Sequence, residues 1–500
     1  MLRDIEKIAS SEYELLVIGA GINGAAIANI AGRHGIKTVL LEKGDFSGGT
    51  SSKSTKLIHG GLRYLENLEF GLVKESLRER CIQLKAASHL VKPLQFIIPV
   101  YQGDKRPLWL MRLGVSLYDF LSGKYVIKKH RNLSADEVLQ FEPQLKKEGL
   151  EGGVMYSDAQ MDDARLCLEN VLSAAENGAD TANYAEVISF VKENGKVKGV
   201  EVKDQLTGAG FRVRAKKIIC AVGPWTNILL KMDDPNAKER IRVTKGSHIV
   251  YSAQLSNNAL LIPSGRDNRV FFIIPWMGCS LIGTTDTDYT GSPDKVEADD
   301  ADIEYLLEGA RRIFPAVGFN RENIVTTFAG LRPLLHRKGS PSRISRRHLI
   351  FETPSGITFV IGGKYTTYRK IAYDALNRLS RVNPQEEFYL SGQEGIVEPA
   401  EDIVKKYGLD LDIASALLAK YGSRYKDVLK LADEDQGLKE RLCPGLPLIK
   451  AQVVYAFRVE MAKTKEDVVS RRLSIAYLAH KKKECEAAVA KLMQDKSLAK

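Results

Sequence analysis

Hydrophobic and polar positions near the start of the chain follow a pattern that predicts a strand, a tight turn, a helix and a second strand. The apolar run at residues 15–18 ends at Gly19, and a second apolar run at residues 38–41 is followed by Glu42. Between them, residues 22–32 are mostly small or apolar, which is typical of a helix packed closely against a sheet. We expect a buried strand–helix–strand unit, because the glycines and the early return to a strand argue against a membrane-spanning helix.

Apolar runs later in the chain predict further strands. Short runs occur at residues 186–190 and 197–202, and residues 216–225 form another run that ends in a small-residue turn. From residue 241 to about residue 290, runs of Val, Ile and Phe alternate with turn residues, which predicts a largely antiparallel sheet. A strand at residues 358–361 leads into a glycine turn and a helix. Beyond about residue 384 the pattern is that of helices alone.

The composition is that of an ordinary globular protein, with 44% hydrophobic and 27% charged residues. Its 500 residues are enough for two or three domains, each with its own core. The net charge of +11 suits an anionic substrate, a phospholipid surface or nucleic acid, and a solvated basic surface accounts for it equally well. Composition therefore leaves the partner open.

Cysteine spacing and the first residues bear on the compartment. The six cysteines are scattered without a CxxC pair, which predicts a reduced cytosolic compartment with neither a zinc site nor a disulfide framework. Residues 1–14 are too charged for a secretory signal, so we expect a cytoplasmic protein whose membrane contact, if any, is peripheral. Residues 105–131 mix aromatic, leucine and basic side chains. Such a segment could lie in an anionic lipid interface, but a core-packed helix with a basic face is the more frequent structure.

Three glycines carry the strongest chemical signal. Gly19, Gly21 and Gly24 have the GxGxxG spacing of dinucleotide-binding turns. In such turns the first glycine permits the bend, the second lets the backbone approach a pyrophosphate, and the third lets the helix pack on the strand. Glu42 ends the second strand, where it can accept hydrogen bonds from an adenosine ribose. The pattern predicts a dinucleotide site and does not separate FAD from NAD.

The loop that follows contains further candidates. The hydroxyls of Thr50, Ser51 and Ser52 could bind phosphate or ribityl oxygens, although such residues are also common in loops. His59 precedes two glycines, so its imidazole could approach a planar ring, and Arg63 follows four positions later. On local grounds alone, a structural role for this histidine is the more frequent one.

Several motifs together resemble a known family. GAGINGAAIA, TSSKSTKLIHGGLRYLE, the Gly-x-Arg-Pro stretch around Arg332 and GGKYTTYRK at residues 362–370 are similar to the FAD-dependent glycerol-3-phosphate dehydrogenases of the D-amino-acid-oxidase-like flavoproteins. The resemblance covers nearly the whole chain and implies FAD rather than NAD. No histidine or cysteine spacing indicates a covalent link, so we expect the FAD to be bound non-covalently.

The resemblance also implies an architecture. We expect an α/β fold with a discontinuous, Rossmann-like FAD-binding domain at residues 1–90, 151–240 and 340–384. A substrate-binding domain with a mixed or antiparallel sheet takes residues 91–150 and 241–339. An all-α domain takes residues 385–500. The chain lacks the calcium-binding loops of the mitochondrial relatives, which favours a bacterial-type enzyme.

The expected catalytic residues are His59, Arg332, Arg63 and Lys364. His59 is the expected base, with Lys364 as the next candidate, because a neutral imidazole can take a hydroxyl proton. Arg332 sits between a glycine and a proline, a rigid mount from which a guanidinium can grip a phosphate by two hydrogen bonds. Arg63, Tyr64 and Lys364 complete the predicted substrate site.

The expected cofactor-binding residues combine the glycine turn, the hydroxyl-rich loop, two later turns and the helix start after residue 362. Positive charge and helix N-terminal amides there would favour a reduced flavin. The set is Gly19, Gly21, Ile22, Asn23, Gly24, Glu42, Lys43, Thr50, Ser51, Ser52, Lys56, Leu57, His59, Gly60, Val187, Ala221, Gly223, Trp225, Gly363, Lys364, Tyr365, Thr366 and Thr367.

The implied reaction is oxidation of glycerol 3-phosphate to dihydroxyacetone phosphate, with electrons passing from FAD to a membrane quinone. We expect a peripheral protein on the inner face of the cell membrane, with a homodimer as a further expectation. Two alternatives keep the fold: an oxygen-using oxidase that releases peroxide, and an amine or amino-acid oxidase. A flavin-dependent RNA-binding protein would need a basic stripe interleaved with aromatics, and the cations here are spread along the chain, so we expect no nucleic-acid partner.

Overall fold

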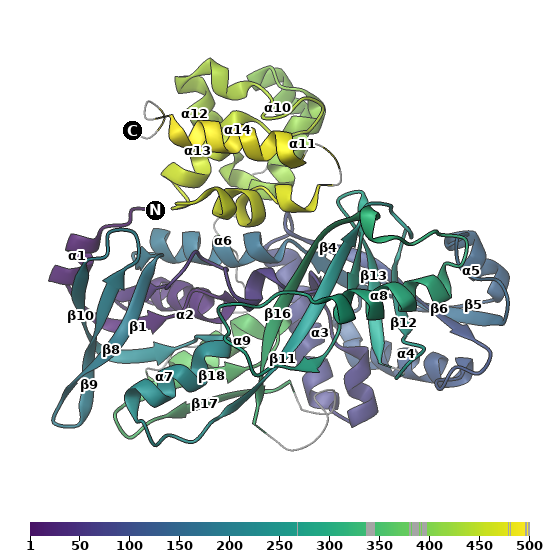
Figure 1. Cartoon of the computed structure of the whole chain (residues 1–500), viewed down its shortest axis with the longest axis horizontal. Coiled ribbons are helices and arrows are strands. Elements are labelled where there is room, and N and C mark those ends of the chain that lie inside the picture. The colour runs from purple at the N-terminus through teal and green to yellow at the C-terminus, as the bar shows by residue number, and fades with distance from the viewer. Residues whose placement is uncertain are drawn as a thin grey trace.

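The computed structural model describes residues 1–267, 269–336, 346–379, 382, 390, 392, 398–478, 480, 482–495 and 498. Two sheets lie side by side, and a group of helices from the C-terminal part of the chain gathers against one of them (Figure 1). This arrangement confirms the predicted fold class, an α/β nucleotide-binding fold with a second sheet and a helical C-terminal part.

The first sheet carries the predicted nucleotide-binding unit at its centre. Its strands are β1 (Glu12–Ile18), β2 (Thr38–Leu41), β7 (Asp180–Ala182), β8 (Ala185–Glu193), β9 (Lys196–Asp204), β10 (Gly210–Cys220), β17 (His348–Glu352) and β18 (Ile357–Gly362). The main order is β17-β18-β10-β1-β2-β7, with β2 and β10 parallel to β1 on either side. The end of β1 is buried on both faces, as a central parallel strand requires.

The second sheet is mostly antiparallel, as its alternating pattern predicts. Its strands are β3 (Leu57–Ile58), β4 (Val91–Tyr101), β5 (Arg131–Leu133), β6 (Leu150–Met161), β11 (Ile241–Tyr251), β12 (Ala259–Pro263), β13 (Val270–Trp276), β14 (Cys279–Gly283), β15 (Thr287–Asp288) and β16 (Ile324–Leu335). The order is β15-β11-β14-β13-β12-β4-β6-β3, and β16 pairs with β11. The pair β12–β4 is parallel, which makes the sheet mixed.

Helices cover both sheets. Those of the first part of the chain are α1 (Ile5–Ser10), α2 (Ile22–Arg33), α3 (Phe70–Ala86), α4 (Leu108–Ser122), α5 (Ala135–Phe141), α6 (Asp163–Glu176), α7 (Thr226–Asp233), α8 (Asp300–Ile313) and α9 (Tyr368–Asn377). The C-terminal helices are α10 (Ala400–Tyr407), α11 (Leu411–Tyr421), α12 (Tyr425–Glu434), α13 (Lys450–Arg458) and α14 (Lys482–Gln494). None of the described helices is both long enough and apolar enough to cross a bilayer.

The strand–helix–strand unit is confirmed as β1, α2 and β2. Small side chains such as Ala25, Ala26 and Ala28 are fully buried, and α2 forms one core with residues of α6 and α9. A helix of small residues can approach its neighbours closely, so its N-terminus is held firmly at the carboxyl end of β1.

The division into three domains stays a prediction. In the structure β3 and β6, which the predicted division gives to the FAD-binding domain, pair within the second sheet. The predicted boundaries at residues 340 and 384–385 lie outside the described residues.

Helix α4 departs from the core-packed helix with a basic face that we expected. Its buried side chains are Val115, Tyr118 and Ser122. The opposite side exposes large apolar side chains as well as Arg112, so the expectation of a basic outer face is wrong. The helix therefore has apolar groups on two sides.

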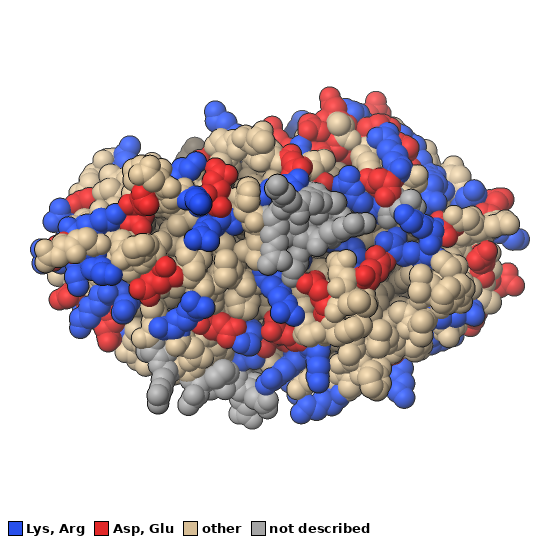
Figure 2. Space-filling view, turned by 90° about the horizontal axis from the view of Figure 1, so that it is seen from below, with Lys and Arg blue, Asp and Glu red and all other residues tan. Residues whose placement is uncertain are grey.

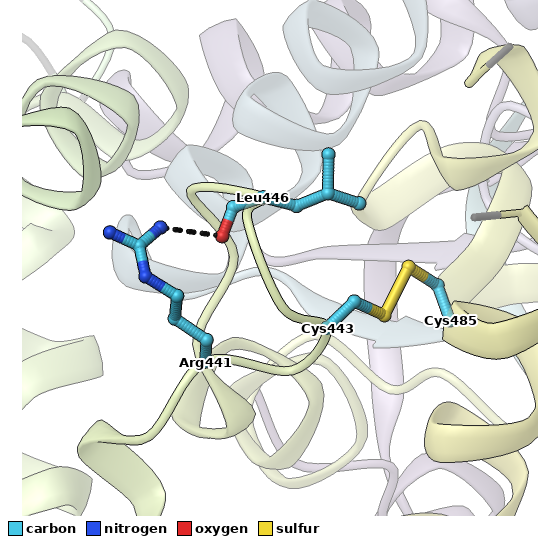
Figure 3. Close-up of a disulfide and its surroundings, with 4 residues drawn as sticks. All are labelled: Arg441, Cys443, Leu446 and Cys485. Carbon is cyan, nitrogen blue, oxygen red and sulfur yellow. Dashed lines mark hydrogen bonds between the residues drawn. A yellow bond between two sulfur atoms is a disulfide. The ribbon is translucent and has the colours of Figure 1, made fainter. Parts of the chain in front are cut away.

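The prediction that the chain has no disulfide is also wrong. A bond joins Cys443 and Cys485, whose Cα atoms lie 5.6 Å apart although 42 residues separate them in sequence (Figure 3). It ties the start of α14 to the loop before α13, and Arg441 closes the same loop by donating from Nη1 to the Leu446 carbonyl at 2.8 Å. Sequence spacing carries no information about this pairing, because it depends on how the helices pack.

Buried ion pairs attach the C-terminal helices to the first sheet. Arg472 donates to both oxygens of Asp45 at 2.7 and 2.8 Å, and Arg471 donates to Asp45 Oδ2 at 2.5 Å. Burial alone would raise the pKa of Asp45, but the charges of the two arginines outweigh burial and lower it. The carboxylate therefore stays ionised and holds the two parts of the chain together.

Asp45→Asn should lower the free energy of unfolding by about 3 kcal/mol, because it leaves buried guanidinium charge without its carboxylate. Thermal unfolding of the purified protein measures the change. Arg212→Met is the control, since Arg212 pairs with Glu201 on the surface and its side chain is 54% exposed; it should leave the midpoint near that of the wild type. Equal midpoints for the two variants would contradict the anchoring role of Asp45.

Candidate functional site

One cavity of about 910 Å³ is lined by residues of both sheets. It begins at the turn between β1 and α2, passes the ends of β2 and β10, and continues to β11, β16 and the turn after β18. The carboxyl ends of parallel strands are the usual ligand-binding edge of such a sheet. The cavity therefore joins the nucleotide-binding edge of the first sheet to the face of the second.

At Gly19 and Gly24 the backbone between β1 and α2 has no room for a side chain. Gly19 has a φ of +95°, and a Cβ there would lie 2.8 Å from the Ala221 carbonyl oxygen. A Cβ on Gly24 would lie 1.8 Å from the Gly19 carbonyl oxygen. The backbone N–H of Ile22 donates to Ser51 Oγ at 2.9 Å, which ties the helix start to the hydroxyl-rich loop. Gly19 and Gly21, which have no side chain, therefore line the cavity with backbone alone.

Glu42 lies at the end of β2 and faces the same cavity. Its Oε2 accepts a hydrogen bond from Ala20 N at 2.8 Å, and its Oε1 accepts one from Gly44 N at 3.0 Å. Burial raises the pKa of this carboxyl, and the two backbone donors oppose that effect. Each oxygen retains a further lone pair with which to accept a ligand hydroxyl.

An aromatic and a cation border this end of the cavity. Lys43 Nζ lies 4.4 Å from the centroid of the Trp225 ring, and Trp225 Nε1 donates to Asp294 Oδ1 at 3.0 Å. Val187, Ala221 and Gly223 line the cavity nearby. A glycine turn at a helix start, a strand-end carboxylate and a flat aromatic wall are the parts that an adenine dinucleotide requires, so the residues present fit FAD.

Arg332 lies at the other end, where the second sheet forms the wall. It sits on β16, and a Cβ on Gly246 of the neighbouring strand would lie 2.1 Å from its Nη2. Its guanidinium donates to Thr284 Oγ1 at 2.7 Å and to Asp286 Oδ1 at 3.2 Å. Burial lowers the pKa of Arg332 to about 10, although Asp286 opposes that effect. The group is partly buried, oriented and still charged at neutral pH.

Lys364 and Tyr64 lie together beside the same region. Lys364 Nζ is 4.4 Å from the centroid of the Tyr64 ring and donates to Ser76 Oγ at 2.7 Å. Burial lowers the pKa of Lys364 to about 7, against the opposing charge of Asp158. An anion in the cavity would restore its positive charge, because an opposite charge favours the protonated amine.

His59 reaches the cavity from the segment after β3. The Thr366 hydroxyl bridges its backbone, accepting from His59 N and donating to His59 O, each at 3.2 Å. Burial lowers the pKa of His59 to about 3, and the charges of Lys364 and Arg63 act in the same direction. The imidazole is therefore neutral at physiological pH and able to accept a proton.

A second histidine, His248 on β11, also lines the cavity. Its ring stacks on Phe328 at a centroid distance of 4.8 Å, and its Nε2 lies 3.0 Å from Thr55 Oγ1. Its Nδ1 is buried without a hydrogen-bond partner among the described residues. Burial, together with the charges of Arg332 and Lys56, lowers the pKa of His248 well below its ordinary value.

Most of the predicted site residues meet in this cavity. Those that line it are Gly19, Gly21, Ile22, Asn23, Glu42, Lys43, Thr50, Ser51, Leu57, His59, Arg63, Tyr64, Val187, Ala221, Gly223, Trp225, Arg332, Gly363, Lys364, Tyr365 and Thr366. They come from segments more than 300 residues apart in sequence. The fold therefore brings the predicted cofactor residues and the predicted substrate residues into one space.

Five predicted cofactor residues do not line the cavity: Gly24, Ser52, Lys56, Gly60 and Thr367. Lys56 is buried and pairs with Asp163, with Nζ 2.5 Å from Oδ1. The N–H of Gly60 donates to Asp158 Oδ1 at 3.2 Å. These two residues contact other protein groups and do not line the cavity. A sequence motif does not reveal such contacts.

Sequence reasoning missed several residues of the cavity. His248 is a lone histidine within a strand pattern, and Thr284 and Asp286 stand in an ordinary turn, so no local signal marked them. Arg346 lines the cavity as well, and Arg471 reaches it from the C-terminal helices. Strand pairing or helix packing places each of these residues at the cavity, and a local sequence motif does not predict such contacts.

The geometry defines a class of protein: a flavin-dependent oxidoreductase whose dinucleotide-binding turn and second-sheet cations share one cavity. Residues 14–369 match the family of FAD dependent oxidoreductases, and residues 385–498 match the C-terminal domain of alpha-glycerophosphate oxidase. The chain belongs to this family of FAD-dependent oxidoreductases, which confirms the expected cofactor.

Relatives narrow the comparison further. The chain is 40% identical over 506 residues to the glycerol-3-phosphate dehydrogenase of Synechocystis sp., covering 96% of this chain and 92% of the relative. It is 35% identical to the aerobic glycerol-3-phosphate dehydrogenase of Staphylococcus aureus, covering 94% and 88%. The structure of glycerol-3-phosphate dehydrogenase from Bacillus halodurans complexed with FAD superposes with a TM-score of 0.82 at 31% identity, covering 99% and 93%. These findings confirm the resemblance to the glycerol-3-phosphate dehydrogenases.

Gly21→Ala should weaken FAD binding about tenfold or more while the fold is kept. The new methyl group would meet only Ser51 Oγ, at 3.1 Å, within the protein, but it would obstruct the approach of a pyrophosphate to the backbone. Titration of the FAD-depleted protein with FAD measures the affinity, and thermal unfolding of the depleted protein checks the fold. Gly318→Ala is the control, because nothing lies within 4 Å of its Cβ. Equal FAD affinity in both variants would place the pyrophosphate elsewhere.

Proposed function

We propose that the protein oxidises glycerol 3-phosphate to dihydroxyacetone phosphate and delivers the electrons, through FAD, to a membrane quinone. One observation carries the proposal: a single cavity joins the dinucleotide-binding turn to a group of cations and two neutral histidines. The names of the relatives, which are glycerol-3-phosphate dehydrogenases, support the same substrate.

The cations are suited to hold the phosphate of the substrate. Arg332 is fixed by Thr284 and Asp286, so its guanidinium is oriented before a ligand arrives. Arg63 and Lys364 line the same cavity and add positive charge. Binding a dianion among preoriented cations would place the rest of the small substrate in a defined direction, and proton and hydride transfer depend on such positioning.

Oxidation of the secondary alcohol breaks a C–H and an O–H bond. FAD, when bound, supplies a ring nitrogen, N5, that accepts the hydride and can later release electrons one at a time. The protein must take the hydroxyl proton, and His59 is our proposed base because it is neutral, lines the cavity and is close to Lys364 and Arg63. His248 is the second candidate, since its Nδ1 is buried without a partner among the described residues.

We propose a quinone as the acceptor and a peripheral position on the inner face of the cell membrane. The support is the printed name of the Staphylococcus aureus relative, an aerobic dehydrogenase, rather than any residue of the cavity. A cytoplasmic location and a homodimer remain predictions. Oxygen is the alternative acceptor, and release of peroxide in place of quinone reduction would identify it.

An amine or amino-acid oxidase is the alternative with the same fold. Structures of such oxidases share the fold at low identity, among them glycine oxidase from Bacillus cereus with a TM-score of 0.53 at 20% identity. An amino-acid substrate carries one carboxylate, which a single arginine can bind. The additional cations that line the cavity with Arg332 favour a phosphate instead.

Anaerobic addition of glycerol 3-phosphate should bleach the visible absorbance of the bound flavin, and added quinone should restore it. Arg332→Met should raise the concentration needed for half-bleaching at least about tenfold, because a charge-assisted phosphate contact is lost. With unphosphorylated glycerol, the wild type and the variant should behave alike. Bleaching by an amino acid but not by glycerol 3-phosphate would contradict the proposal.

His59→Ala should slow flavin reduction by roughly a hundredfold or more if His59 takes the proton. Stopped-flow measurement of the anaerobic reduction rate tests this, with the retained flavin absorbance as the check that FAD is still bound. His248→Ala is the matched comparison, because both histidines line the cavity. A near-normal rate in His59→Ala together with a large loss in His248→Ala would move the base to β11.

A further inference from the structure

A loop attached to the second sheet reaches the nucleotide-binding edge of the first. Residues 289–299 connect β15 to α8, and Asp294 and Val296 of this loop line the main cavity. Lys43 and Trp225, which lie at the nucleotide-binding edge, line the same cavity. We call residues 289–299 the strap, because both of its ends are attached to the second sheet and its middle lies at the nucleotide end of the cavity.

Ion pairs with β11 hold both ends of the strap. Arg242 donates from Nε to Asp288 Oδ1 at 2.5 Å, just before the strap begins. Lys245 donates to Asp299 Oδ2 at 2.6 Å, at the last residue of the strap. The two ends are therefore fixed close together on one strand, and the residues between them form a loop that projects from the second sheet.

The tip of the strap is a tight turn held by its own hydrogen bonds. The Tyr289 hydroxyl donates to the Lys295 carbonyl at 2.7 Å. Lys295 N donates to the Ser292 carbonyl at 3.1 Å, and Asp294 N donates to Ser292 Oγ at 3.3 Å. These bonds fix the backbone around Asp294, so its carboxylate has a defined position before a ligand arrives.

Asp294 joins the strap to the first sheet. Its Oδ1 accepts a hydrogen bond from Trp225 Nε1 at 3.0 Å and forms an ion pair with Lys43 Nζ. Because the Lys43 amine lies 4.4 Å from the centroid of the Trp225 ring, the three side chains contact one another. Burial alone would raise the pKa of Asp294, but its contacts with Lys43 and Trp225 outweigh burial and lower it. The carboxylate is therefore ionised at neutral pH, and we call these three side chains the clasp.

The clasp differs from an ordinary surface ion pair. On the face seen in Figure 2, Lys and Arg side chains lie among Asp and Glu side chains, and an exposed pair of that kind contributes little to stability. The clasp instead connects the two sheets, and all three of its members line the cavity. A contact in this place can act on the ligand that the cavity holds.

We propose that the strap closes over the adenosine end of bound FAD, and that opening of the clasp limits the release of the cofactor. Glu42, the expected partner of the adenosine ribose, directly precedes Lys43 in sequence. The indole of Trp225 offers the adenine a flat apolar surface. Its position is set by Gly49, where a Cβ would lie 3.2 Å from Trp225 Cζ3.

The strap supplies what the edge of the first sheet lacks. The ligand-binding edge of an open α/β sheet is a crevice that faces solvent, so a dinucleotide there needs a cover from elsewhere in the chain. A ligand leaves a covered site only after the cover opens, and the contacts broken on opening slow its release. This inference goes beyond the proposed function, because it needs the cofactor and neither the substrate nor the electron acceptor.

The rate of FAD release from the loaded full chain tests the proposal, measured after dilution by the fluorescence of FAD that appears in solution. Asp294→Ala should release FAD about threefold to tenfold faster, because opening then breaks neither the hydrogen bond nor the ion pair. Trp225→Phe keeps an aromatic ring but loses the N–H donor, so it should give a smaller increase. The control is Glu201→Ala, since Glu201 pairs with Arg212 outside the cavity, and it should release FAD as the wild type does.

A charge exchange tests the ion pair itself. Lys43→Glu and Asp294→Lys should each speed FAD release, because like charges then face each other. The double variant should release FAD more slowly than either single variant, because it restores a pair of opposite charges. Added salt should speed release from the wild type more than from Asp294→Ala, since salt screens exposed charges.

Equal release rates in the wild type and Asp294→Ala would overturn the inference. Thermal unfolding separates a cover from a structural pair: Asp294→Ala should lower the midpoint of the loaded protein more than that of the FAD-free protein. Equal losses in both forms would make the clasp structural and would also overturn the inference. The proposed function is tested separately, by the bleaching of the wild-type flavin with glycerol 3-phosphate, so either proposal can fail while the other stands.

Discussion

The site depends on close packing between the glycine turn that follows β1 and the end of β10. A Cβ at Gly24 would lie 1.8 Å from the Gly19 carbonyl oxygen, and one at Gly19 would lie 2.8 Å from the Ala221 carbonyl oxygen. The start of α2, the end of β1 and the end of β10 therefore meet at van der Waals contact. Because Gly19 and Gly21 carry no side chain, they line the cavity with backbone, and the strand-end Glu42 accepts a hydrogen bond from the Ala20 amide beside them.

The second sheet adds charge to that floor. Arg332 and Lys364 are partly buried, and desolvation lowers the pKa of both, to about 10 and about 7. A cation withdrawn from water is costly unless it is paired, and Arg332 receives partial compensation from Asp286, Thr284 and the Thr285 carbonyl. An anionic substrate would complete the compensation. The same groups that destabilise the empty cavity thus favour a phosphate within it.

The features that the sequence predicted correctly are formed by residues that lie close together along the chain. The strand–helix–strand unit and the antiparallel second sheet follow from periodicity within short windows, and both are present. The glycine turn and the Gly-x-Arg-Pro stretch led to Gly21, Glu42 and Arg332, all of which line the cavity. Two predictions from local patterns were wrong. The mixed composition of α4 did not indicate that large apolar side chains are exposed on it. The spacing of the cysteines did not indicate that Cys443 pairs with a cysteine distant in sequence. His248 and the Asp45–Arg472 pair depend on contacts between distant segments, which no motif encodes.

The most direct test of this account is a crystal structure of the FAD-loaded protein with dihydroxyacetone phosphate. The account predicts the flavin nucleotide along the β1–α2 turn, the phosphate in hydrogen-bond contact with the Arg332 guanidinium, and the carbonyl oxygen of the product beside His59 or His248. A phosphate bound outside this cavity, or a flavin whose pyrophosphate makes no contact with the turn, would contradict it.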